Sequence, residues 1–188
     1  MSRALPVILI GTFIAALAAS TDAGAPRAAA QAPEDHTTTH TAGSAGALAA
    51  QVREATAAYR DVAQAIAAGY QQFGGCVSGP EAGAMGIHFV NGALVDDTLD
   101  VTRPEALIYE VAGGVARLVG VEYITPVAAW DASHEGPPVL MGQHLHLMVT
   151  PNRYRLPALY ELHVWAWRTN PSGTFADWNP LVSCDGAE

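Results

Sequence analysis

The sequence contains no lysine, so all nine of its cationic side chains are arginines. Eighteen acidic residues stand against them and leave a formal net charge of −9 at pH 7. A protein with this charge repels the phosphate groups of nucleic acids and of anionic lipids. The composition therefore excludes nucleic acid and anionic membrane surfaces as the main partners.

Cysteine is almost as scarce, since the chain has only Cys76 and Cys184 and no Cys-x-x-Cys motif. The missing motif argues against a thioredoxin-like redox centre. In an exported chain two cysteines are expected to pair, and we predict a disulfide bond between them. The alternative is a pair of thiols that acts on a metal or a redox partner, and it predicts free thiols in freshly isolated protein.

Long hydrophobic runs are limited to Leu5–Ala19, which follows Arg3 and is interrupted by Pro6. This run is too short for a comfortable membrane span. With the alanine-rich sequence behind it, the run predicts a signal peptide over residues 1–30 and a secreted or periplasmic protein, with no stable membrane insertion after cleavage. An uncleaved membrane anchor is the alternative. We also predict a disordered linker over residues 31–46 and one domain over residues 47–188.

Apolar residues recur at steps of three and four between Ala45 and Ala68, which predicts an amphipathic helix that Ser44 begins and Gly69 ends. Alternating segments follow, separated by turn signals at Asn91-Gly92, at Gly113-Gly114 and in the Pro-rich stretch after Val149. The pattern predicts an α+β fold in which the N-terminal helix packs on an antiparallel, hairpin-built sheet that can curl into a half-barrel.

A turn at Gly113-Gly114 would pair Glu110 with Arg117 and Tyr109 with Leu118. The same register places Glu122 opposite Glu105, on a face with apolar residues. A carboxylate is costly to bury alone on such a face. Glu122 must therefore reach water at the strand end, pair with an arginine, or belong to a functional site.

The segment Leu159–Trp167 alternates at the strand period of two, so its side chains divide into two sets on opposite faces of a strand. One face carries Tyr160, Leu162, Val164 and Ala166. The other face carries Glu161, His163, Trp165 and Trp167. An acid, an imidazole and two indoles together are typical of a pocket wall. We expect Trp165 and Trp167 to shape that pocket.

The partner of this strand is expected to be Gly142–Val149, which also alternates. A hairpin between the two segments would place His144 opposite His163 and His146 opposite Glu161. Three imidazoles and a carboxylate then meet on one patch, and they offer the donors that suit zinc, copper, nickel, iron or manganese.

These residues predict a pocket that binds a divalent transition metal whose identity the sequence leaves open. The expected ligands are His144, His146 and His163, with Glu161 as a ligand or a catalytic general base. His88 and Glu122 are second-tier candidates, because a lone histidine among aliphatic residues is usually a core residue bonded to the backbone. The alternative is a buried hydrogen-bonded network in a non-enzymatic module that holds a small-molecule ligand or a partner protein.

Four blocks of sequence resemble an uncharacterised family of exported bacterial proteins. They are Met85–Asn91, Leu118–Tyr123, Leu162–Trp165 and Asn170–Cys184. The resemblance extends from the predicted helix to Cys184. It carries over no activity and no catalytic residue, so the functional prediction rests on the chemistry of the side chains.

Overall fold

A computed structural model describes residues 42–79 and 81–187 of the chain. The predicted signal peptide lies outside these residues, and so does the predicted linker up to residue 41. The elements are listed here in chain order: α1 Ala42–Thr56, the 3₁₀ turn η1 Ala57–Arg60, α2 Val62–Ala67, β1 Gln71–Gly79, β2 Gly83–Val90, β3 Ala106–Ala112, β4 Val115–Pro126, α3 Val127–Ser133, β5 Val139–Leu140, β6 Gln143–His144, β7 His146–Met148 and β8 Leu159–Val164.

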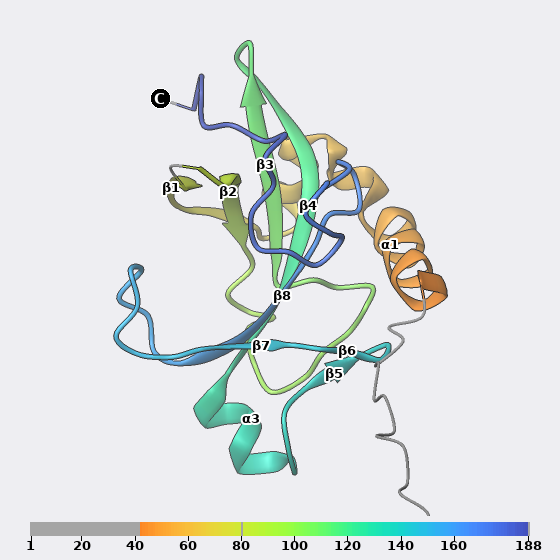
Figure 1. Cartoon of the computed structure of the whole chain (residues 1–188), viewed down its shortest axis with the longest axis vertical. Helices are drawn as coiled ribbons and strands as arrows, with labels where there is room; N and C mark the ends of the chain where they lie inside the picture. Colours follow the sequence, from red (N-terminus) through yellow and green to blue (C-terminus); the bar gives the residue numbers. More distant parts are fainter. Residues whose placement is uncertain (1–41, 80, 188) are drawn as a thin grey trace, which may run out of the picture. The chain divides into compact units, whose positions relative to one another are not determined.

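The predicted α+β class is confirmed, because the N-terminal helices accompany an antiparallel six-stranded sheet that curls into a half-barrel (Figure 1). The strand order is β1-β2-β3-β4-β8-β7, and β5 and β6 form a separate two-stranded sheet. None of the helices among the described residues has the length and apolar character that a membrane span needs.

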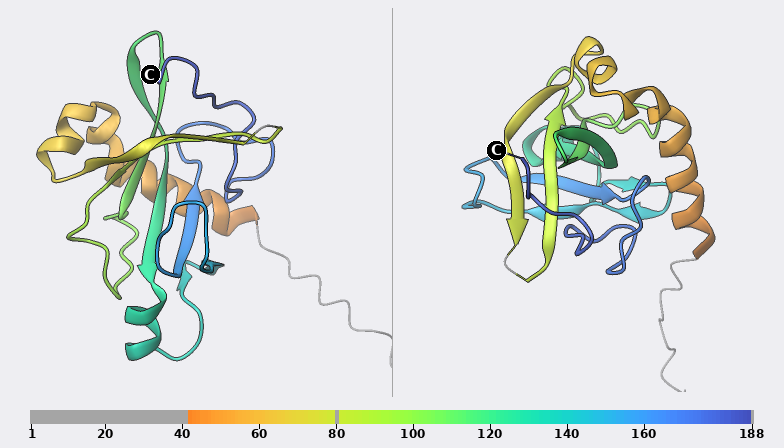
Figure 2. Two further views of the ribbon diagram at one scale, coloured as in Figure 1. Left: turned by 90° about the vertical axis from the view of Figure 1, so that its left-hand side faces the viewer. Right: turned by 90° about the horizontal axis from the view of Figure 1, so that it is seen from above.

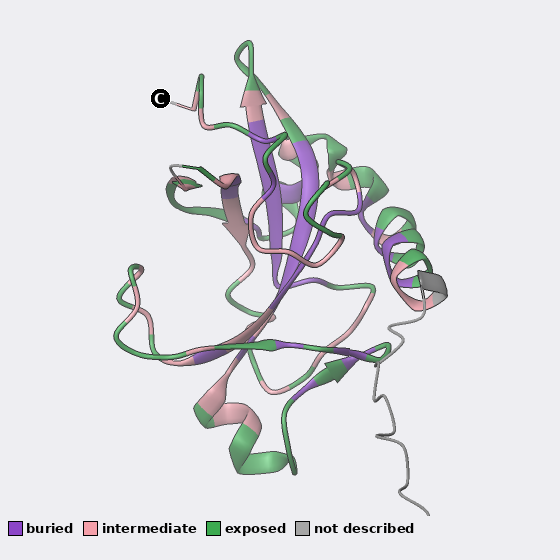
Figure 3. Cartoon of the chain, in the orientation of Figure 1, coloured by how far each residue is buried: buried purple, intermediate pink, exposed green. Residues whose placement is uncertain are grey.

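The sheet has a different cover on each face (Figure 2). On one face α1 and α2 pack against apolar residues of β3, β4 and β8, and Leu48, Val52, Tyr109 and Val164 belong to this larger core. On the other face the C-terminal segment covers a smaller cluster that includes Ile108 and Val182. Burial is greatest along the central strands and falls toward the sheet edges (Figure 3). The two faces therefore carry different chemistry.

The single predicted helix is divided into α1, η1 and α2. The Asp61 side chain accepts a hydrogen bond from the Ala63 backbone N–H and caps α2. Before it, the Tyr59 carbonyl group accepts a hydrogen bond from the Tyr109 hydroxyl group. The predicted end is confirmed, since Gly69 follows α2 with a φ of 97°.

The predicted hairpin at Asn91-Gly92 is wrong. The β2 strand pairs instead with β1 and β3, and residues 91–105 form a loop. The Asn91 side chain donates to the Ala68 carbonyl group at the end of α2 and accepts from Ala93 N–H. These bonds tie Asn91 to the helix end and to its own turn, so the strand stops there.

The other two hairpin predictions are confirmed in part. Across Gly113-Gly114, Glu110 pairs with Arg117 and Tyr109 with Leu118, as predicted. His146 pairs with Glu161 across β7 and β8, again as predicted. The predicted disulfide bond joins Cys76 of β1 to Cys184. This bond fixes the C-terminal segment to the sheet edge.

Candidate metal site and adjoining cavity

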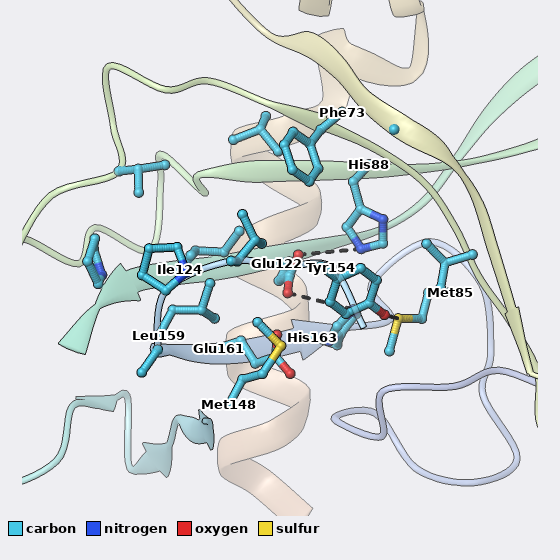
Figure 4. A pocket seen from close by; sticks show the side chains of 18 of the residues that line it. Phe73, Met85, His88, Glu122, Ile124, Met148, Tyr154, Leu159, Glu161 and His163 are labelled. Carbon is cyan, nitrogen blue, oxygen red and sulfur yellow. Dashed lines mark hydrogen bonds and ion pairs between the residues drawn. The ribbon is translucent and has the colours of Figure 1, made fainter. Parts of the chain in front are cut away.

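Three polar side chains from three strands meet on the sheet face opposite α1 and α2 (Figure 4). Glu122 of β4 lies directly opposite His163 of β8. His88 of β2 reaches them across β3, which presents Ala106 opposite Glu122. The small Ala106 side chain leaves room for the imidazole and the carboxyl group to meet.

A β-bulge in β4 determines which face Glu122 occupies. Tyr109 pairs with Leu118, but Ile108 pairs with Gly120, so β4 contains one extra residue at Val119. A bulge of this kind reverses the alternation of the residues beyond it. The regular register predicted from the sequence put Glu122 opposite Glu105 on the apolar face. The observed bulge pairs it with Ala106 and turns its side chain toward His88 and His163.

The three side chains lie at distances suited to binding one ion. Glu122 Oε2 is 3.4 Å from His88 Nε2, and Glu122 Oε1 is 4.0 Å from His163 Nε2. One ligand atom from each of the three residues lies within 4.8 Å of the others. Ligand atoms about 2.1 Å from a tetrahedral ion are about 3.4 Å apart. Only a small closure is therefore needed for all three to contact one ion.

Burial controls the charge of the three groups. It lowers the pKa of His88 to about 4 and lowers the pKa of His163 well below its usual range, with His88 and His146 adding to the second shift. Burial also raises the pKa of Glu122 well above its usual value, and the neighbouring Glu161 carboxyl group adds to that shift. At neutral pH both imidazoles are uncharged, so their lone pairs are free for a cation.

His163 lacks hydrogen-bond partners in the part of the chain that the structure describes. Both of its ring nitrogens are buried without one, and so is Asp177 Oδ1. Each such group costs about 1–3 kcal/mol when buried. Asp177 Oδ1 lies 3.7 Å from His163 Nδ1. A proton on Nδ1 facing Asp177 leaves the Nε2 lone pair directed toward Glu122 and His88, which is how outer carboxylates orient metal-binding histidines.

Glu161 adds a second carboxyl group beside this cluster. It lies opposite Ile124 on β4 and opposite His146 on β7. Burial raises its pKa, while a hydrogen bond from the Glu122 carboxyl group acts in the other direction. The pKa of both carboxyl groups is thus raised, because burial disfavours a charge on either one.

A cavity of about 320 Å³ opens over the cluster. His88, Glu122, Glu161 and His163 contribute to its wall, and apolar side chains surround them (Figure 4). The Tyr154 hydroxyl group donates to Met85 Sδ at 3.4 Å within the same wall. The polar groups are concentrated in one patch of an otherwise mostly apolar cavity.

In the structure, the predicted ligands His144 and His146 lie outside the cluster of His88, Glu122 and His163. His144 is exposed and pairs with Val139 in the separate two-stranded sheet, so it does not lie opposite His163. His146 has the predicted partner Glu161, but its side chain is 55 % exposed and its Nδ1 lies 3.6 Å from Asp177 Oδ1. The hairpin is shorter than predicted, because β7 begins only at His146.

The two predicted pocket tryptophans do not line the cavity. Trp165 packs in the smaller core, stacks on His163 with ring centroids 6.4 Å apart and donates to the Ala176 carbonyl group. Trp167 packs against the larger core and donates to Thr56 Oγ1 in α1. The strand ends at Val164, and the predicted alternation fails at Trp167, which packs against the core of the opposite face. Trp165 keeps the predicted face but lies outside the cavity wall. Trp165 thus contacts His163 from outside the cavity wall.

Sequence reasoning ranked His88 and Glu122 too low and missed Asp177. Asp177 lies in an irregular C-terminal loop, and no periodicity of the sequence connects such a loop to a strand. The structure holds that loop in place through hydrogen bonds between Asn179 and Ala84 and through the disulfide bond. Its position over His163 was not predicted.

Comparison of the chain with protein-family models, with curated proteins and with solved structures found no match. The family resemblance drawn from the four sequence blocks stays a prediction. The side-chain cluster and its cavity are therefore the grounds on which a function is proposed.

Proposed function

We propose that the protein binds one divalent transition metal ion through His88 Nε2, His163 Nε2 and the Glu122 carboxylate. The observation that carries this proposal is the convergence of these three ligand atoms around a buried His163 that has no hydrogen-bond partner among the described residues. An ion between them would satisfy Nε2 and replace the proton on Glu122.

The donor set favours a transition metal over calcium or magnesium. Two imidazoles and one carboxylate suit zinc, iron and other first-row divalent ions, whereas calcium and magnesium prefer oxygen ligands. Three protein ligands leave at least one coordination position free, and the cavity lies beside it. An open position is the arrangement used by metal sites that bind or activate another molecule.

Glu161 has a different role in this proposal. Its carboxyl group lies beside Glu122 and lines the cavity, but it is outside the group of three ligands. It is placed to take a proton from a molecule bound at the open position, as a general base does. This would be its contribution to any reaction at the site.

The disulfide bond supports a location outside the cytoplasm. Disulfide bonds between Cys76 and Cys184 form and persist in oxidising compartments. Together with the N-terminal apolar run, the bond favours a secreted or periplasmic protein.

Elemental analysis of protein purified without an affinity tag tests the metal site. We expect about one ion per chain after zinc reconstitution and dialysis, and loss of that ion in His163→Ala and Glu122→Gln. His144→Ala is the matched control, because this exposed histidine lies outside the cluster and should leave the zinc content unchanged. Thermal melting of each variant reports whether it is folded.

A folded wild-type protein that retains no zinc, cobalt, iron or manganese would overturn the proposal. So would loss of metal in His144→Ala combined with retention in folded His163→Ala. The second result would place the metal outside the cluster of His88, Glu122 and His163.

A further inference from the structure

The cavity is much larger than the proposed ion requires. Its volume is about 320 Å³, and a water molecule occupies about 30 Å³. The space beside an ion therefore holds a molecule of roughly ten water-sized groups. Small-molecule sites commonly begin at about this size.

The chemistry of the wall favours an apolar occupant. The surrounding side chains come from β1, β2, β4, β7, β8 and the loop before β8, and they include Phe73, Val77, Met85, Ile124, Met148 and Leu156. Water gains few hydrogen bonds from such a surface, so an apolar molecule displaces it at a net gain. Most of the occupant should therefore be hydrocarbon.

The polar patch restricts the charge of the occupant. No arginine lines the cavity among the described residues, and the sequence has no lysine. The carboxylates of Glu122 and Glu161 offset the two charges of a divalent ion. The loaded patch is therefore close to neutral overall, and it offers no uncompensated charge of opposite sign to an anion or to an ammonium group.

We infer that the cavity takes a neutral, mostly apolar molecule that carries one carbonyl or hydroxyl oxygen. The hydrocarbon part contacts the apolar wall, and the oxygen faces the patch of His88, Glu122, Glu161 and His163. The inference rests on the proposed metal site only for the contact between this oxygen and the ion. The fit of the apolar part depends on the cavity alone.

Calorimetric titration with three eight-carbon probes tests the charge preference. The probes are 2-octanone, octanoate and octylammonium, each added to zinc-loaded and to chelator-stripped protein. We expect 2-octanone to bind zinc-loaded protein at least tenfold more tightly than either charged probe. Octanoate or octylammonium binding as tightly as the ketone would overturn the inference, and so would the absence of binding by all three.

A pair of leucine variants tests the location. Leu156→Trp narrows the cavity from its loop wall and should weaken 2-octanone binding at least tenfold. Leu147→Trp is the control, because Leu147 is exposed on β7 and does not line the cavity. Equal binding by both folded variants would show that the ketone binds elsewhere and would overturn the assignment.

These measurements distinguish a failure of the proposed metal site from a failure of the proposed neutral ligand. Protein that takes up no metal but still prefers 2-octanone contradicts the metal site and supports the neutral ligand. Protein that holds zinc but prefers octanoate supports the metal site and contradicts the neutral ligand.

Discussion

Glu105 is a buried carboxyl group outside the proposed ligand set. Its side chain is 1 % exposed, and Oε2 accepts a hydrogen bond from the Ile124 backbone N–H at 2.9 Å. Burial raises its pKa from 4.5 to about 8. The folded protein therefore keeps the Glu105 proton over a pH range in which the unfolded chain releases it.

This shift predicts a measurable pH dependence of stability. Between about pH 4.5 and 8 the folded state binds more protons at Glu105 than the unfolded state, so rising pH weakens the fold. Glu105→Gln removes this titration but keeps an oxygen for Ile124. We expect the free energy of unfolding of the wild type to fall relative to the variant, by on the order of 1 kcal/mol per pH unit.

Denaturant titrations of both proteins at pH 5, 6, 7 and 8 measure this difference. The two histidines of the cluster titrate in both proteins, so their effect cancels in the comparison. Parallel pH profiles for the wild type and Glu105→Gln would contradict the prediction.

For individual residues, the sequence predicted part of the candidate site. Alternation along Leu159–Val164 identified His163 and Glu161 as members of a polar face. Alternation carries no information about a third or fourth strand, however, so it could not select His88 over His144. The ranking depended on strand order, which the sequence pattern left open.

The β4 strand determines the site more than any other element, because its bulge turns Glu122 to the cavity face. Gly120 lies just after the extra residue and opposite Ile108. A Cβ atom on Gly120 would lie 2.9 Å from the Val164 carbonyl oxygen of the neighbouring strand. The close approach of β4 and β8 at this point requires glycine.

Gly120→Ala should therefore disturb the strand pair that holds Glu122 opposite His163. We expect a loss of about 1–3 kcal/mol in the free energy of unfolding, because a backbone atom must move to admit the methyl group. Gly92→Ala is the control, since a Cβ atom there meets nothing within 4 Å. Chemical denaturation measures both, and equal stability of the two variants would contradict the proposed close contact.

The errors in the predicted secondary structure have identifiable physical causes. The β1 strand is rich in glycine and glutamine, which have low strand propensity, and it was not predicted. Pairing with β2 and the disulfide bond hold it at the sheet edge. The β4 bulge adds one residue without any turn signal, so the hairpin at Gly113-Gly114 was predicted correctly near its turn and wrongly beyond Leu118.

For the whole molecule, the disulfide bond joins the first strand to the end of the chain. Cys76 and Cys184 are 108 residues apart, so the closed loop includes most of the described chain. Replacing both with serine removes this restriction from the unfolded state. We expect a loss of about 4–5 kcal/mol in the free energy of unfolding by the chain-entropy model.

Denaturant unfolding of the double variant beside the wild type, with and without reductant, checks this value. Reductant should destabilise the wild type and leave the double variant unchanged. Equal stability of the two proteins under oxidising conditions would contradict the prediction.

The overall class, the packing of helices on an antiparallel sheet and the disulfide bond were predicted from the sequence, because periodicity and cysteine count report them directly. The position of the cavity was not, since it depends on how the sheet curls and on where the C-terminal segment lies.

The strands that carry the proposed ligands are synthesised one after another. In chain order, His88 belongs to β2, Glu122 to β4 and His163 to β8, while Asp177 follows them all. A nascent chain that has not yet extended past β8 lacks one imidazole and the carboxylate behind it. The ion would therefore be selected where synthesis is complete and the protein reaches its final shape, so the metal supply of that compartment would determine which element it carries.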